Sequence, residues 1–84
     1  MVTKQDVIKA VESAGWRKIE DSDFTEYDNY PYKTKIISVN DFSLLAILKV
    51  GAVIEIHFED ISFVFFGNNN SIHIVLAHGG AVSF

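Results

Sequence analysis

The sequence predicts a small α+β domain, with one or two helices packed on an antiparallel sheet. Apolar residues recur at helical spacing near the N-terminus and alternate with polar residues after residue 52. Glycine and asparagine separate the alternating segments, as turns require. The expected elements are an N-terminal helix at about 4–14, a second helix at about 41–50, and a C-terminal β-meander with strands 53–58, 61–66, 71–77 and 81–84.

The N-terminal helix has sequence signals at both of its ends. Thr3 is a good N-cap residue, and Asp6 completes a short-armed variant of the capping box. Gly15 suits the left-handed position that ends a helix, and Trp16 is then expected to fold back onto the helix. The apolar stripe between these ends consists of Val7, Ile8, Val11 and Ala14.

Between the two expected helices, the chain is predicted to contain two strands and a loop. Residues 16–20 suit a short strand. Residues 21–31 are rich in Asp, Ser and Asn and end at the only proline, which predicts a loop. Residues 32–39 alternate and finish in β-branched residues, which predicts a strand.

Residues 40–51 suit two different structures. Asn40 or Asp41 can cap a helix that ends at Gly51, and leucine and alanine favour a helix. The apolar face of that helix would contain Phe42, Leu45, Ile47 and Leu48. A strand over residues 43–50 is the alternative. We favour the helix.

The C-terminal meander can be tested for consistent side-chain parity across its turns. Turns at 59–60, 67–70 and 78–80 pair Phe58 with Ile61, Phe63 with Ile74, and Leu76 with Val82. On these registers Phe63 and Ile74 are expected to be core residues. Glu59-Asp60 is the weakest of the three turns, because tight hairpins prefer Asn-Gly or Asp-Gly.

Length and composition predict a single domain over residues 1–84, without disulfides or thiolate zinc sites because cysteine is absent. The N-terminus lacks a signal-peptide pattern and no apolar run could span a bilayer, so we expect a cytoplasmic protein that does not bind membranes. The net charge is −4, and all 7 basic residues lie at or before Lys49. Direct binding to nucleic acid is therefore not expected.

Residue patterns typical of catalysis or metal binding are missing from the sequence. No nucleophile elbow, P-loop or dinucleotide-binding motif is present. His57 and His73 are expected on strands two apart, about 10 Å from each other, which is too far for one zinc ion. Residues 21–32 begin like a calcium loop but lack its glycine and its bidentate glutamate. We expect no enzyme activity, no metal and no cofactor.

Residues 20–32, here called the acidic segment, interleave carboxylates with aromatic rings. This pattern favours docking on a basic partner. An ordinary solvated loop is the simpler interpretation of the same residues. The candidate partner-binding residues are Asp21, Asp23, Phe24, Glu26, Tyr27, Asp28 and Tyr30.

The second face of the predicted meander is more apolar than a solvated sheet face should be. A helix or another chain is therefore expected to cover it, and a homodimer would use the same patch from both copies. The candidate contact residues on this face are Val53, Val64, Phe66 and Val75.

Together these observations predict a non-enzymatic protein-interaction module whose partner is another protein with a basic surface. The specific hypothesis is an acidic inhibitor of a nucleic-acid-handling protein, of which phage-encoded inhibitors of host defence are one class. The alternatives are a sensor domain that holds a small ligand between helix and sheet, and a structural homodimer subunit.

Overall fold

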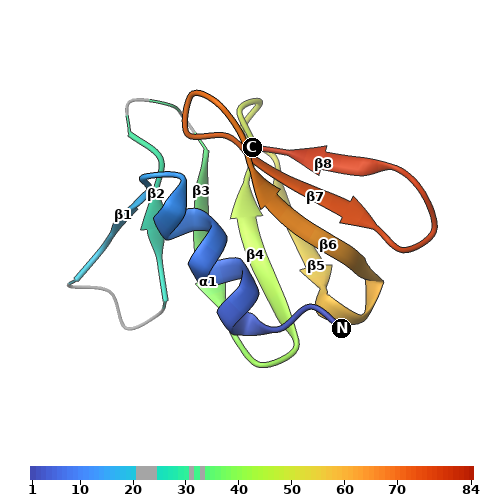
Figure 1. The fold of residues 1–84 in the computed structure, drawn as a ribbon. Helices are drawn as coiled ribbons and strands as arrows, with labels where there is room; N and C mark the ends of the chain where they lie inside the picture. The colour runs from blue at the N-terminus through green and yellow to red at the C-terminus, as the bar shows by residue number, and fades with distance from the viewer. Residues whose placement is uncertain (21–24, 31, 33) are drawn as a thin grey trace.

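The fold comes from a computed structural model that describes residues 1–20, 25–30, 32 and 34–84. These residues form an α+β structure, which confirms the predicted class (Figure 1). The elements are α1 (Lys4–Ser13), β1 (Arg17–Lys18), β2 (Tyr27–Asp28), β3 (Lys35–Val39), β4 (Ser43–Ile47), β5 (Val53–His57), the 3-10 helix η1 (Phe58–Asp60), β6 (Ile61–Phe66), β7 (Ile72–Leu76) and β8 (Ala81–Ser83).

The strands form two antiparallel sheets, and neighbours in sequence are neighbours in each sheet. The first sheet has the order β1-β2-β3-β4-β5 and the second has the order β6-β7-β8. In Figure 1, α1 lies in front of β3 and β4, and β6 crosses in front of β5 with β7 and β8 extending beyond it. Helix α1 and β6 therefore lie on the same face of the five-stranded sheet, and the core contains residues of α1 and both sheets.

Helix α1 begins and ends as its sequence predicts. The Thr3 N–H donates to the Asp6 carboxylate at 2.8 Å, and the Asp6 N–H donates to the Thr3 hydroxyl at 3.4 Å. At the other end Gly15 has a φ of 90°, and the Trp16 N–H donates to the Val11 carbonyl at 3.0 Å. This turn returns Trp16 to the core, where it is 5% exposed.

The predicted second helix at 41–50 is wrong, because residues 43–47 form strand β4 in the interior of the five-stranded sheet. Asn40 caps a turn instead of a helix, since its side-chain oxygen accepts from the N–H groups of Phe42 and Ser43. Leu44 and Ala46 are fully buried on β4, which pairs with β3 on one side and β5 on the other. Tertiary pairing thus overrides the helical propensity of leucine and alanine.

The predicted hairpin at Glu59-Asp60 is also wrong, and the meander begins at β6. Strand β5 pairs with β4 across a turn in which Gly51 has a φ of 90°. Glu59 and Asp60 lack the positive-φ preference of a two-residue hairpin, and they lie in η1. This short helix directs β6 into the second sheet.

The register of β6 and β7 differs by one residue from the predicted register. Phe65 pairs with His73, and Phe66 pairs with Ile72 across a turn over residues 67–71. Asn69 and Asn70 both adopt positive φ in this turn, with values of 60° and 59°. A slip of one residue exchanges the two faces of a strand. Phe63 is therefore 51% exposed, so its prediction as a core residue is wrong. The prediction for Ile74 is confirmed, because Ile74 is fully buried.

The other pairings of the second sheet keep the core on one face. A bulge between Ile61 and Phe63 returns Ile61 to the core, where it is 4% exposed. Strands β7 and β8 pair Val75 with Ala81, two residues from the predicted register, so no side chain changes face. The fully buried apolar side chains come from α1 and both sheets: Val7, Val11, Ile36, Leu44, Ala46, Ile72 and Ile74.

Candidate binding surface

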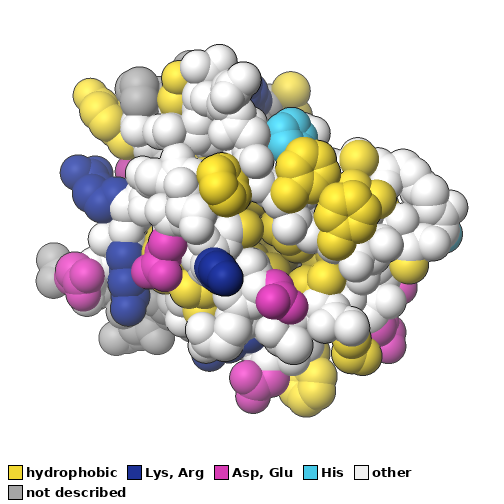
Figure 2. Space-filling view, viewed as in Figure 1, with side chains coloured by type: hydrophobic (Ala, Val, Ile, Leu, Met, Phe, Trp, Pro, Cys, Tyr) yellow, Lys and Arg dark blue, Asp and Glu magenta, His cyan; other side chains and the backbone are white. Residues whose placement is uncertain are grey.

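Three exposed phenylalanines on β6 form the most distinctive surface of the molecule. Phe63 and Phe66 are each 51% exposed and Phe65 is 44% exposed. Figure 2 shows hydrophobic side chains gathered over this part of the fold. We call Phe63, Phe65 and Phe66 the phenylalanine surface.

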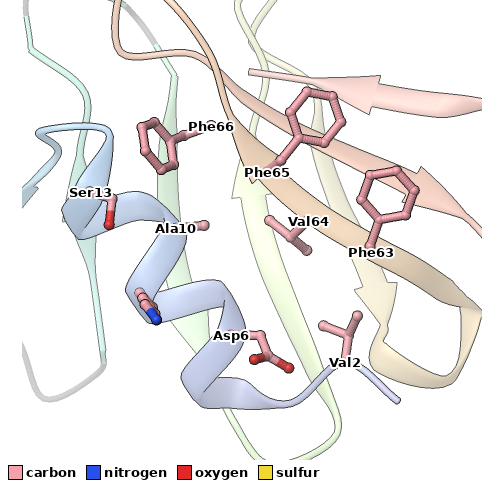
Figure 3. A pocket seen from close by; sticks show the side chains of 9 residues that line it. Val2, Asp6, Ala10, Ser13, Phe63, Val64, Phe65 and Phe66 are labelled. Atoms are coloured by element: carbon pink, nitrogen blue, oxygen red, sulfur yellow. The ribbon is translucent and has the colours of Figure 1, made fainter.

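The phenylalanine surface borders a groove of about 460 Å³ between α1 and β6. In Figure 3, Val64 points into the groove and Phe66 leans toward the C-terminal half of α1, while Phe63 and Phe65 project from the opposite side of the strand. The helix wall contains Asp6, Lys9, Ala10 and Ser13. The Asp6 carboxylate already accepts the Thr3 N–H, so it is engaged in the helix cap.

The outer face of the β6–β8 sheet is an ordered layer of rings. The ring centroids of Phe63 and Phe65 are 5.6 Å apart, and those of Phe65 and His73 are 4.9 Å apart, both pairs being stacked. The two imidazole nitrogens of His73 hydrogen-bond with the hydroxyls of Ser71, at 3.2 Å, and Ser83, at 2.8 Å. The polar atoms of this face are therefore satisfied within the sheet.

The four residues of the predicted contact face do not share one face, because Val53 lies on the other sheet and the register of β6 places Val64 and Phe66 on the opposite face from Val75. Val53 lies on the five-stranded sheet and is 59% exposed. Val64 and Phe66 lie on the side of β6 that faces the groove, whereas Val75 lies on the outer face with Phe63. An apolar second face does exist on the meander, but the register slip places different phenylalanines on it.

The acidic segment is only partly available for binding. Asp21, Asp23 and Phe24 lie outside the residues that the structure describes. Tyr27 is 2% exposed, and its hydroxyl donates to the Glu12 carboxylate at 3.3 Å. Burial, and then the negative charge of Glu12, raises the pKa of Tyr27, so the hydroxyl stays protonated. Tyr27 is a core residue and cannot serve as an exposed anchor.

The remaining residues of the acidic segment differ in exposure. Asp28 faces Arg17 across β1 and β2, with 3.8 Å between carboxylate and guanidinium. Glu26 is half-buried, and Tyr30 is 73% exposed. Tyr30 is therefore the aromatic side chain of this predicted set that the structure places in solvent.

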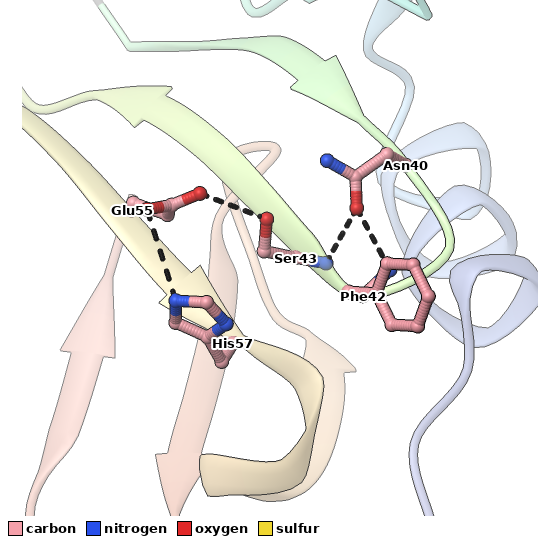
Figure 4. Close-up of polar contacts among 5 residues, drawn as sticks. All are labelled: Asn40, Phe42, Ser43, Glu55 and His57. Carbon is pink, nitrogen blue, oxygen red and sulfur yellow. Dashed lines mark hydrogen bonds and ion pairs between the residues drawn. The ribbon is translucent and has the colours of Figure 1, made fainter.

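A serine, a glutamate and a histidine meet on the solvent face of the first sheet, in an order that does not suit catalysis (Figure 4). The Ser43 hydroxyl donates to Glu55 at 3.0 Å, and the His57 imidazole lies 3.7 Å from the same carboxylate. In a catalytic triad the imidazole contacts the serine directly and removes its proton. Here the carboxylate lies between them, so the arrangement is a surface network.

The described part of the chain also lacks the features of a metal site and of a membrane-spanning helix. It contains no group of three His, Cys, Asp or Glu side chains that could hold a metal ion. No helix among these residues is long and apolar enough to cross a membrane.

Comparison with known proteins finds no match, since no family model, curated protein or solved structure is similar to the chain at a significant level.

Sequence reasoning missed Phe63 and Phe65 as surface residues because it placed them in the core. The available signal was the charge distribution, since residues 61–84 contain no Lys, Arg, Asp or Glu. A solvated sheet of that length usually carries charged side chains on its open face. Their absence indicates an apolar outer face whichever register β6 adopts.

Proposed function

We propose that the protein is a non-enzymatic interaction module that binds another protein molecule through the phenylalanine surface. The observation that carries this proposal is the exposure of three aromatic rings on one short strand, at 51%, 44% and 51%. Aromatic side chains are enriched at the centres of protein interfaces, where they act as anchors. Exposed apolar patches of this kind are often functional.

The energetic motive for binding comes from the apolar area that the three rings leave in water. A phenylalanine buries about 150–250 Å² when it is fully covered, so a half-exposed ring leaves about 100 Å² uncovered. At about 25 cal/mol per Å², covering each ring contributes about 2.5 kcal/mol before the costs of association. Asp6 and Lys9 are the ionisable side chains that line the groove beside the rings, and Asp6 is engaged in the helix cap.

Site-specific photo-cross-linking in the native host tests this proposal. We expect p-benzoyl-phenylalanine at position 65 to form a covalent adduct with a partner protein on irradiation. The matched control is the same probe at Phe42, which is 77% exposed but lies on the turn between β3 and β4. Adducts at position 65 that are absent at position 42 support the proposal. Equal adducts at both positions, or none at position 65, contradict it.

As a second candidate, we propose that the acidic segment docks on the basic surface of a nucleic-acid-handling protein. The observation that favours it is the 73% exposure of Tyr30 in a segment that also carries the exposed Glu20. Exposed carboxylates mainly increase the rate of association with a basic partner and make binding depend on salt.

Charge reversal tests the second candidate. The variant with Asp21, Asp23 and Glu26 changed to Lys raises the net charge from −4 to +2. We expect it to lose adducts formed by p-benzoyl-phenylalanine at Tyr30. A control variant with Asp41, Glu59 and Asp60 changed to Lys has the same net charge and should keep them. If both variants behave alike, the acidic segment has no specific docking role.

A further inference from the structure

We infer that the partner of the phenylalanine surface is a second copy of this chain, bound about a two-fold axis through the outer face of the β6–β8 sheet. The inference rests on the proposed function and names its partner. Three observations carry it: the charge distribution of the chain, the form of the outer face, and the position of α1 beside β6.

The charge distribution favours a second copy over a charged partner. All 7 basic and all 11 acidic residues lie at or before Asp60, so residues 61–84 carry no formal charge apart from histidine. About six charged residues are expected in a segment of that length at average composition. A charged partner would lose hydration against this face without gaining an ion pair. Two copies can meet here without like-charge contact, although each chain has a net charge of −4.

The outer face has the form that face-to-face sheet packing requires. Its side chains stand in two rows across the three strands: Phe65, His73 and Ser83 in one row, and Phe63, Val75 and Ala81 in the other. Stacking holds the rings in a layer, and His73 makes its hydrogen bonds inside the sheet. Two sheets pack about 10 Å apart when both present apolar inner faces. An isologous contact would bring the same rows together from both copies.

The inner face of the second sheet is already covered, as the full burial of Ile72 and Ile74 indicates. The run from Phe63 to Phe66 is apolar at every position, which is typical of a strand covered on both faces. A second copy supplies the missing outer layer. Phe63 and Phe65, the two rings on this face, offer about 200 Å² per copy, against about 800 Å² in a standard interface. Neighbouring residues must add the rest, so we expect a dissociation constant in the micromolar range.

Helix α1 argues against a dimer formed by edge-to-edge pairing of β6. It packs against β6 on the side away from β7, and the groove lies between them (Figure 3). A paired strand would need to lie about 4.8 Å from β6, in the space that α1 borders. Among the described residues, no element covers the outer face in the way that α1 borders the β6 edge.

Sedimentation of the wild-type protein between about 1 and 200 µM tests the inference, because a micromolar dimer dissociates across this range. We expect Phe65→Lys to weaken the dimer at least tenfold. Phe42→Lys is the matched control, since it adds the same charge at an exposed phenylalanine outside the proposed interface. Circular dichroism of both variants should match the wild type. Dissociation by both variants alike would overturn the inference.

Cross-linking gives a second measurement that does not depend on adding a charge. The chain has no cysteine, so a single cysteine can be introduced without interference. We expect Val75→Cys, on the outer face, to form covalent dimers with a short bis-maleimide at least tenfold more efficiently than Val53→Cys. Val53 is the control because it is 59% exposed on the other sheet. Equal yields would contradict the proposed face.

The failure of this inference can be told apart from the failure of the proposed function. Photo-adducts at position 65 with twice the mass of the chain support both. Adducts of another mass, together with a wild type that stays monomeric at about 200 µM, retain the proposed function and overturn the homodimer. A monomeric protein without adducts at position 65 overturns both.

Discussion

Replacing Ile74 with alanine is expected to lower the free energy of unfolding by about 3 kcal/mol, whereas Phe63→Ala should cost only about 1 kcal/mol. Ile74 is fully buried in β7, between Val64 on one side and Val82 on the other. Its truncation leaves a cavity as well as removing buried apolar area. Phe63 is 51% exposed, so much of its ring is in water before the substitution.

Urea denaturation followed by circular dichroism measures both changes. The dependence of the free energy of unfolding on urea concentration should be the same in both variants and the wild type. Val53→Ala is the control for an exposed apolar side chain, since Val53 is 59% exposed. This comparison tests the register of β6 and β7. If Phe63→Ala destabilised the protein as strongly as Ile74→Ala, Phe63 would face the core, as in the register predicted from the sequence.

Trp16→Ala is expected to cost about 3–5 kcal/mol, which is a large part of the stability of a domain of this length. Trp16 is 5% exposed and joins three parts of the fold that are distant in sequence. It follows α1 directly, its indole N–H donates to the Asn70 carbonyl at 2.6 Å, and its ring meets Phe84 edge-on with centroids 6.4 Å apart. Removing the ring separates all three parts.

Trp16→Phe separates the contribution of the ring from that of the hydrogen bond. The Asn70 carbonyl keeps a second donor, the Asn29 amide at 3.2 Å, so it is not left without a partner. We therefore expect a cost of about 1–2 kcal/mol for Trp16→Phe. Thermal unfolding followed by circular dichroism suits both variants, because they lack the only tryptophan. Equal costs for the two variants would mean that the hydrogen bond, and not the ring, stabilises this junction.

Helix α1 was predictable because its signals are local. Thr3 and Asp6 satisfy free N–H groups of the first turn, and Gly15 allows the turn that ends the helix. Residues 43–47 show the opposite case, because leucine and alanine favour a helix when neighbouring strands are ignored. Residues 43–47 are instead held as a strand by pairing with both β3 and β5, and Leu44 is fully buried there. The propensities of individual residues do not include the effect of that pairing.

The candidate binding surface, like the fold, was predictable from the sequence only in part. The absence of charge after Asp60 and the apolar run Phe63–Phe66 are visible in the sequence, and they indicate an apolar meander. The choice between Phe63 and Phe66 for the outer face depends on one residue of register. A turn over 67–71 with two asparagines at positive φ decides that register. The energy of one turn conformation is too small and too local to be read from residue types alone.

Residue order by itself determined the α+β class, the start and end of α1, the burial of Ile74 and the uncharged C-terminal segment. These features follow from caps, periodicity and composition, which act within a few residues of the chain. The tertiary structure decided that β5 turns back to β4, that Tyr27 enters the core, and that Phe63 and Phe65 face outward. Tyr27 is buried because β2 and α1, which are distant in sequence, meet on one core. The β4–β5 hairpin and the register of β6 are choices between turns and pairings that residue types alone leave open, and the assembled sheets decide them.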